Sequence, residues 1–411
     1  MKKILIILIS AVVLSLVVYQ LLRPKLAENS YIKGKTLLDS MKYSEALVKF
    51  SKAISLREKP IYFNARGLAN AGLQKDSVAI SDFNKAIALN SSVAEYYLNR
   101  GVSYRKLKKF DNSLADINKA IEKDGKYAKA YYNRGLLKAS QMEFDEAVKD
   151  YNKSIELDGS NIEAFYSRGE SRSRLNDFMG AISDYDKMIE GSNATAEAYK
   201  KRGIFKLNIQ DFAGAEKDLT TASSMDVNDK EIFYNLGQVK FNLNKYDEAI
   251  DNLNKAIKID SKYDLAYSVK GGALLKKGDF SSAIKEFSKA IELNGSFLKA
   301  YYGRGVAKAL SQNYKESILD FSRAIDLDKN FAQAYYNRAV SKAILGNHQD
   351  ALADYDFTIQ KDPKDAEAYY NRGISRMNVK DSKGACEDFH KAQELGYKEA
   401  EPMIKMYCPK K

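Results

Sequence analysis

The chain has 411 residues, of which 45% are hydrophobic and 29% charged, a balance that is ordinary for a folded, soluble body. Its formal net charge of +12 is concentrated near the N-terminus, where residues 1–100 hold 15 Lys and Arg against 7 Asp and Glu. No basic stripe continues along the rest of the chain, which argues against nucleic-acid binding. The basic N-terminal part would suit anionic lipid headgroups, or would simply favour solubility.

The first predicted element is an apolar helix over residues 4–22, within an N-terminal segment 1–25. Only Ser10, Ser15 and Gln20 interrupt the apolar run, which is long enough to span about 28 Å as a helix. The flanking sequence Arg23-Pro24-Lys25 is expected to end it. We interpret it as an uncleaved signal anchor with the following residues on the extracytoplasmic side, in a bacterial periplasm. Cleavage of a signal peptide near Ala27 is the alternative, although the residues before it fit poorly.

Residues 26–395 repeat themselves with a period of 34 residues. The marker is a small residue, and every step between markers is 34 except the first, which is 33. Twelve residues after each marker comes a second small residue, and four residues later a bulky one, the spacing of one helix face. The markers are Gly34, Gly67, Gly101, Gly135, Gly169, Gly203, Gly237, Gly271, Gly305, Ala339 and Gly373. The period predicts eleven stacked helical hairpins instead of one closed core.

This pattern of aromatic, small, small, aromatic and alanine positions resembles the tetratricopeptide repeat (TPR) family. The resemblance implies an all-α, right-handed superhelix whose first helices line a concave wall. Three departures are Ala339 at a glycine position and Met188 and Thr358 at alanine positions. The resemblance also implies a protein-binding module, without a cofactor or an enzymatic activity.

A charge pair recurs where the family usually has leucine. Arginine precedes the marker in eight copies, and the same eight copies carry aspartate sixteen residues later. In one further copy both charges are replaced together, by Leu236 and Asn252, which argues for pairing inside each repeat. Two unrelated, solvated charges are the alternative. The predicted ion pairs include Arg134–Asp150, Arg168–Asp184, Arg304–Asp320, Arg338–Asp354 and Arg372–Asp388.

Tyrosine recurs three residues before the marker and asparagine two residues before it. Asparagine is a poor helix former, so its recurrence within a helix needs a cause, and its amide can bind a peptide group twice. The row resembles the asparagine ladder of eukaryotic protein-GlcNAc transferases. Packing of the tyrosines and bridging by the asparagines between repeats is the alternative. The candidate partner-binding residues of the concave face are Asn99, Tyr132, Asn133, Tyr166, Tyr234, Asn235, Tyr302, Tyr336, Asn337, Tyr370 and Asn371.

The C-terminal part, residues 396–411, is predicted to form a capping helix over roughly residues 398–407. Cys386 lies in the last second helix and Cys408 follows the cap, so an antiparallel arrangement brings them face to face. An oxidising compartment favours a disulfide between them, with two free thiols as the alternative. A metal site of Cys386, His390 and Cys408 would lack a fourth ligand.

No catalytic motif, phosphate loop or zinc-protease motif is present in the chain. The sequence therefore predicts a membrane-anchored scaffold that binds an extended or helical segment of partner proteins. Self-association through repeat surfaces, as an envelope assembly factor, is the alternative. Some members of the family bind the C-terminal carboxylates of heat-shock chaperones through a set of Lys, Asn and Arg residues. This chain lacks the arginine of that set, which argues against the same function here. The sequence leaves the partner and the oligomeric state open.

Overall fold

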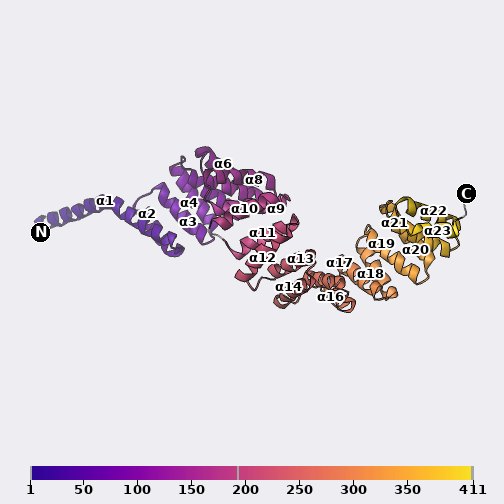
Figure 1. The fold of residues 1–411 in the computed structure, drawn as a ribbon. Coiled ribbons are helices and arrows are strands. Elements are labelled where there is room, and N and C mark those ends of the chain that lie inside the picture. The colour runs from indigo at the N-terminus through magenta and orange to yellow at the C-terminus, as the bar shows by residue number, and fades with distance from the viewer. Residues whose placement is uncertain (1, 192–193, 409–411) are drawn as a thin grey trace. The chain divides into compact units, whose positions relative to one another are not determined.

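The computed structural model describes residues 2–191 and 194–408 and, for residues 2–9, 11 and 12, the backbone alone. Over these residues the chain forms 23 helices and no strand (Figure 1). The helices fall into two compact units, Met1–Ala194 and Thr195–Lys411. The all-helical prediction is therefore confirmed.

Unit 1 contains five helical hairpins, each made of a first and a second helix. The first helices are α1 (Lys2–Asp39), α3 (Pro60–Gly72), α5 (Ala94–Lys106), α7 (Ala128–Ser140) and α9 (Ile162–Arg174). The second helices are α2 (Tyr43–Leu56), α4 (Asp76–Leu89), α6 (Phe110–Lys123), α8 (Phe144–Leu157) and α10 (Phe178–Glu190).

Unit 2 contains six hairpins and one further helix. The first helices are α11 (Ala196–Asn208), α13 (Lys230–Asn242), α15 (Asp264–Lys276), α17 (Leu298–Leu310), α19 (Ala332–Ile344) and α21 (Ala366–Asn378). The second helices are α12 (Phe212–Met225), α14 (Tyr246–Ile259), α16 (Phe280–Leu293), α18 (Tyr314–Leu327), α20 (His348–Lys361) and α22 (Ser382–Glu394). Helix α23 (Ala400–Tyr407) packs on α22, where the cap was predicted.

Each hairpin turns at one residue in the left-handed backbone region. Nine of these residues are not glycine, so their backbone adopts a conformation that is rare for L-residues with a side chain. The turn residues are Met41, Gln74, Lys108, Met142, Asn176, Gln210, Asn244, Gly278, Gln312, Gly346 and Lys380.

The two helices of a hairpin approach closely at the marker glycine. A Cβ atom on Gly135 would lie 2.6 Å from the ring of Tyr151, and one on Gly305 would lie 2.7 Å from the ring of Phe321. The bulky residue of the second helix therefore fills the space that the missing side chain leaves. This contact explains why a small residue recurs every 34 residues.

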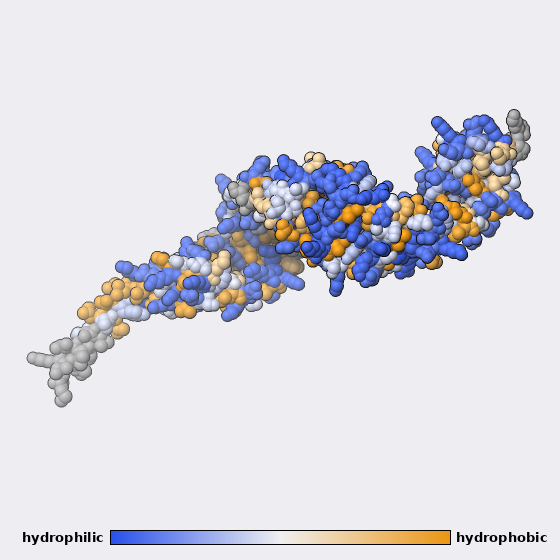
Figure 2. Space-filling model, turned by 60° about the horizontal axis from the view of Figure 1, so that its bottom comes forward, coloured by the Kyte–Doolittle hydropathy of each residue, from blue (hydrophilic) through white to orange (hydrophobic). Residues whose placement is uncertain are grey.

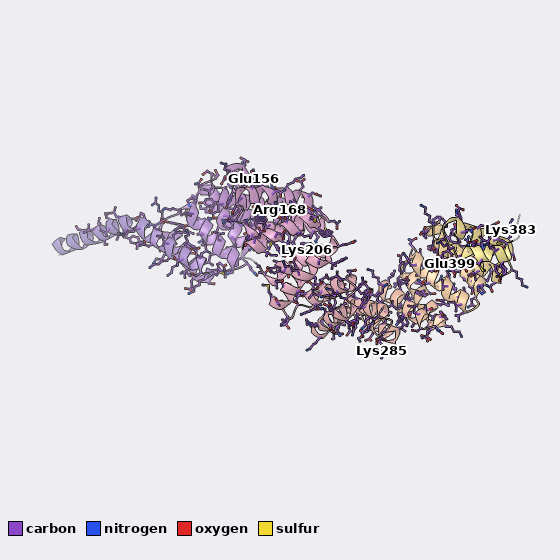
Figure 3. All side chains as sticks on the ribbon, in the orientation of Figure 1. Glu156, Arg168, Lys206, Lys285, Lys383 and Glu399 are labelled. Atoms are coloured by element: carbon purple, nitrogen blue, oxygen red, sulfur yellow. A yellow bond between two sulfur atoms is a disulfide. The ribbon has the colours of Figure 1, made fainter. Side chains whose placement is uncertain are left out.

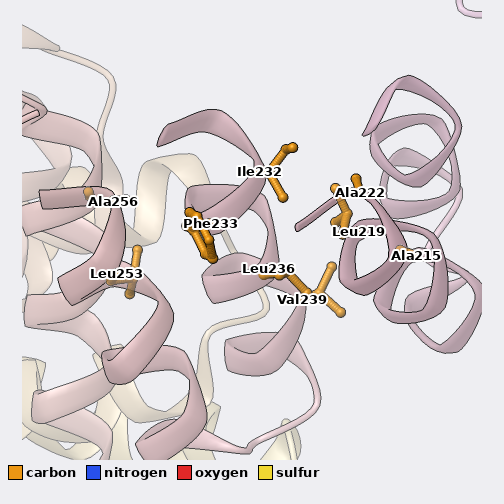
Figure 4. Close-up of a cluster of buried hydrophobic side chains, with 10 residues drawn as sticks. Ala215, Leu219, Ala222, Ile232, Phe233, Leu236, Val239, Leu253 and Ala256 are labelled. Carbon is orange, nitrogen blue, oxygen red and sulfur yellow. The ribbon is translucent and has the colours of Figure 1, made fainter. Parts of the chain in front are cut away.

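The buried apolar side chains form separate clusters along the array instead of one common core. Figure 4 shows one of these clusters, in which Ile232, Leu236 and Val239 of α13 face Leu219 and Ala222 of α12. All five side chains are at most 4% exposed. This cluster joins a second helix to the first helix that follows it, which is how a linear array is held together.

Helix α1 differs from the prediction. It runs without a break from Lys2 to Asp39 and contains Pro24, whereas the sequence predicted an end at residues 23–25. Packing beyond the proline accounts for the difference, because Ala27 is fully buried against Ala53 and Tyr62. That burial offsets the hydrogen bond that Pro24 removes from the helix.

From Val13 to Leu22, α1 exposes apolar side chains. They include Leu14 at 64% and Leu21 at 74% exposure (Figure 2). Within the residues that the structure describes, no helix is long and apolar enough to cross a membrane. This finding does not support the predicted transmembrane helix. Part of the predicted segment, residues 4–9 and 11–12, lies outside the described side chains.

Candidate functional site

Within each unit the first helices form a continuous surface, here called the first-helix wall. In unit 1 each of α1, α3, α5 and α7 contacts the next first helix along the chain. In unit 2 the contacts run from α11 through α13, α15, α17 and α19 to α21. All the candidate tyrosines and asparagines lie on these helices, at equivalent positions of their repeats.

The candidate tyrosines pack against rings of the second helices. The ring centroids of Tyr132 and Tyr151 are 6.0 Å apart, and equivalent pairs are Tyr166–Tyr185, Tyr302–Phe321, Tyr336–Tyr355 and Tyr370–Phe389. Several also contact the next repeat, where Tyr302 and Phe331 are 4.9 Å apart and Tyr234 and Tyr263 are 5.1 Å apart. Burial raises the pKa of Tyr302 and of Tyr234. These tyrosines therefore help to join repeats, while Tyr166 is 38% exposed.

Three of the five candidate asparagines bridge neighbouring repeats through their amide N–H groups. The Nδ2 atom of Asn337 donates to the hydroxyl of Tyr302 at 3.0 Å, and that of Asn371 donates to the hydroxyl of Tyr336 at 2.9 Å. In unit 1, Asn99 donates to the Oδ1 atom of Asn64 at 2.9 Å. The recurrence of asparagine in mid-helix thus has a structural cause that sequence reasoning had kept as the alternative.

The side-chain carbonyl oxygens of four candidate asparagines do not bridge repeats. Asn133 and Asn235 donate to the backbone carbonyls of Lys129 and Glu231, four residues earlier in the helix. In the described chain, the Oδ1 atoms of Asn133, Asn235, Asn337 and Asn371 accept no hydrogen bond. The oxygens of Asn235, Asn337 and Asn371 therefore form a row of available acceptors on the first-helix wall of unit 2, and that of Asn133 is an available acceptor on the wall of unit 1.

The predicted ion pairs form inside each repeat. The shortest N–O distances are 2.6 Å for Arg134–Asp150, 2.5 Å for Arg168–Asp184, 2.7 Å for Arg304–Asp320, 2.7 Å for Arg338–Asp354 and 2.6 Å for Arg372–Asp388. These aspartates are at most 4% exposed. Each arginine donates through two nitrogens, the forked geometry that suits a carboxylate. Figure 3 draws these side chains and labels Arg168.

Each of these arginines joins three helices and not only two. Besides Asp150, Arg134 donates through Nη1 to the Oδ1 atom of Asn118, on the second helix of the preceding repeat, at 2.9 Å. Arg304 reaches Ser288 in the same way at 3.0 Å. The guanidinium also lies over the aromatic ring three residues earlier, for example 5.4 Å from the ring centroid of Tyr131.

A second cation, which sequence reasoning missed, contacts the same aspartates. Lys138 lies 2.8 Å from Asp150, and Arg172 lies 2.9 Å from Asp184. The signal was present in the sequence, because a cation follows the arginine by four residues, one helical turn, in six of the repeats. Those cations are Lys138, Arg172, Lys206, Lys308, Lys342 and Arg376.

Three repeats lack the arginine–aspartate pair, and the first of them has Lys33 and Lys49 at the two positions. Where Leu236 and Asn252 replace the pair, Lys255 lies over the ring of Phe233 at 5.5 Å, the place that an arginine takes elsewhere. Lys240 of the same repeat bonds Glu216 at 2.6 Å and also contacts Glu248. In the next repeat a lysine and a glutamate take the two positions and also pair, with Lys270 2.8 Å from Glu286.

The last repeat and its cap are joined covalently. Cys386 and Cys408 form a disulfide, with their Cα atoms 5.6 Å apart. The bridge ties α23 to α22 and covers Phe389 and Ala392, which are fully buried. Because both sulfurs are bonded to each other, the alternative metal site with His390 does not form.

Comparison with known proteins identifies the same helical repeat. Tetratricopeptide repeat models match residues 94–126, 128–161, 231–263, 269–334 and 336–393, together more than half of the chain. No curated protein matches the chain significantly.

Several solved structures resemble parts or most of the chain. The Cut9–Hcn1 hetero-tetramer of the APC/C is 13% identical over 93% of this chain and 96% of that one, with a TM-score of 0.49. The C-terminal part of a TPR protein from Cytophaga hutchinsonii is 20% identical over 58% and 98%, with a TM-score of 0.48. YrrB, described as a TPR protein with an unusual peptide-binding site, is 23% identical over 46% and 98%, with a TM-score of 0.42.

Proposed function

The chain belongs to the tetratricopeptide repeat family, and we propose that it is a scaffold that binds an extended or helical segment of a partner protein along the first-helix wall. The observation that carries this proposal is the row of available amide oxygens at Asn235, Asn337 and Asn371 in unit 2, with an equivalent oxygen at Asn133 in unit 1. An extended segment presents backbone N–H groups that such oxygens can accept. The neighbouring tyrosine rings supply rigid contact area.

Photocrosslinking in the native host tests this proposal. A benzophenone amino acid replaces Tyr166 or Tyr336 on the wall, and in a matched control it replaces Leu319, which is 69% exposed on the second helix α18. We expect the two wall positions to crosslink to partner segments and the control position not to do so. Equal crosslinking from α18 would contradict binding at the wall.

A pair of substitutions gives an independent test. Asn133→Ala with Asn337→Ala removes two of the oxygens, and Ala65 already occupies the equivalent position in another repeat, so the fold tolerates alanine there. We expect the double variant to keep its helical circular dichroism and to lose its crosslinked partners. Unchanged partners, together with an unchanged fold, would favour self-association through other surfaces.

The exposed apolar side chains of α1 favour one further assignment within this proposal. Residues 4–22 would hold the protein at a membrane, with the repeats on the extracytoplasmic side, beside the excess of basic residues in the first hundred. Carbonate extraction of host membranes, followed by protease treatment of spheroplasts, tests it. We expect the protein to stay with the membrane and the repeats to be digested from outside; release by carbonate would contradict the anchor.

A further inference from the structure

Arg105, at the end of α5, breaks the repeat pattern. It lies four residues after its marker, and it is the single charged residue among the eleven equivalent positions. The others are Leu38, Ala71, Ala139, Ser173, Leu207, Phe241, Leu275, Ala309, Ala343 and Met377. Ten small or apolar residues show that the packing of a repeat does not require a cation at this place.

The surroundings of Arg105 leave its charge without a partner. Its Nε atom is buried and has no hydrogen-bond partner, and no ion pair of Arg105 forms in the described chain. Burial lowers the pKa of Arg105, and the nearby groups that oppose this shift are the hydroxyls of Tyr132 and Tyr151, not carboxylates. A buried donor without a partner is costly, so an unpaired arginine here is unexpected.

Arg105 lies beside a candidate binding residue of the first-helix wall. Tyr132, on the next first helix α7, acts on it electrostatically and packs on Tyr151. Two further cations, Lys106 and Lys129, lie exposed on α5 and α7 and form no ion pair in the described chain. The carboxylates of this part of the wall are engaged or lie at helix starts: Glu170 accepts from the hydroxyl of Tyr185, and Glu95 and Glu163 lie in first turns.

We infer that Arg105 is the anchor for an acidic side chain, Asp or Glu, of the bound segment. This inference rests on the proposed function and names the chemistry that unit 1 selects. The guanidinium would donate a forked pair of hydrogen bonds to the carboxylate, beside the ring of Tyr132. Asn133, on the same turn of α7, would accept a backbone N–H of the same segment.

Selection of short random peptides displayed on phage tests the inference on the full chain. The wild type is compared with Arg105→Leu, which introduces the residue found at the equivalent positions 38, 207 and 275. The control is Arg323→Leu, which removes the same charge from an exposed position on the second helix α18. We expect the wild type and the control to select peptides enriched in acidic residues, and Arg105→Leu to select peptides without that enrichment.

The affinity of one selected peptide supplies the second readout. Arg105→Leu should weaken it about 10- to 100-fold, the range for a hydrogen bond between charged groups. Changing the acidic residue of the peptide to its amide should weaken binding to the wild type equally and should not affect the variant further. Peptides selected without acidic enrichment would overturn the inference and leave the proposed function standing. Failure of every protein to select peptides would overturn both.

Discussion

At the residue scale, six of the buried aspartates contact two cations each, and Asp150 is one of them. Asp150 is 4% exposed and lies 2.6 Å from Arg134 and 2.8 Å from Lys138. Asp150→Ala removes the buried acceptor that Arg134 and Lys138 share, so we expect the free energy of unfolding to fall by about 3 kcal/mol. Urea denaturation followed by circular dichroism measures the loss.

A double variant separates the charge pair from simple packing. Arg134→Leu with Asp150→Asn reproduces the natural combination of Leu236 and Asn252, and Lys138 keeps Glu146 at 3.7 Å. We expect the double variant to lose clearly less stability than the sum of the two single variants. Additive losses would show that the two residues act independently.

Glu216 gives the fold a predicted dependence on pH. The hydrogen bonds from Lys240 and, less strongly, from Lys245 lower the pKa of Glu216, while burial opposes them. A carboxylate with a lowered pKa in the folded state stabilises the fold above its unfolded pKa, and the contribution disappears as pH falls through the folded value. Glu216→Gln should therefore cost roughly 1 kcal/mol near neutral pH and progressively less below about pH 4. Urea denaturation across this pH range checks it; a difference that does not change with pH would contradict it.

The roles of the paired charges could be predicted from the sequence, but those of the wall tyrosines and asparagines only in part. The pairs could be predicted because eleven copies within one chain act as a series of natural variants, among them the joint loss at Leu236 and Asn252. The tyrosines and asparagines could be placed on one wall, but not divided between packing and binding. That division depends on distances between repeats, such as the 3.0 Å from Asn337 to Tyr302, which no single repeat contains.

At the scale of one hairpin, the left-handed turn residue offers a further test. Met142 has a φ of 65° and is 80% exposed, so its side chain contributes little packing. Met142→Gly should relieve the backbone strain and raise the free energy of unfolding by roughly 0.5–1 kcal/mol after the greater entropy of unfolded glycine is subtracted. Thermal denaturation measures it.

The opposite substitution is the matched control. Gly346 occupies the same turn in unit 2, with a φ of 82°, and nothing lies within 4 Å of a Cβ atom built there. Gly346→Met should therefore destabilise the protein through the backbone alone. Changes of the same sign in the two variants would contradict the explanation.

The helices themselves could be predicted from the sequence because the spacing of small and bulky residues repeats so strictly. The exception is α1, where local rules at Pro24 predicted an end and the helix continues. Packing of Ala27 in the core outweighed the local preference. Tertiary burial of this kind is invisible in a short stretch of sequence.

At the scale of the whole molecule, a destabilising substitution should affect only the repeats near it. Each repeat contacts its neighbours, so stability is approximately a sum of local contributions. Cys408→Ser removes a bridge between residues 22 apart, which should cost about 3 kcal/mol. We expect hydrogen exchange to rise in α22 and α23 and to stay unchanged in α11–α15. Faster exchange throughout unit 2 would show long-range cooperativity.

The three-helix arrangement of the arginines also bears on how such a gene changes length. Arg134 finds its carboxylate within its own block of 34 residues and requires only a small polar side chain, Asn118, from the block before. Other blocks supply serine there, as Ser288 does for Arg304. Unequal crossing-over that inserts or deletes one whole block would therefore leave no orphaned carboxylate at the new junction. Lineages could extend or shorten the binding surface by single recombination events, without prior compensating mutations.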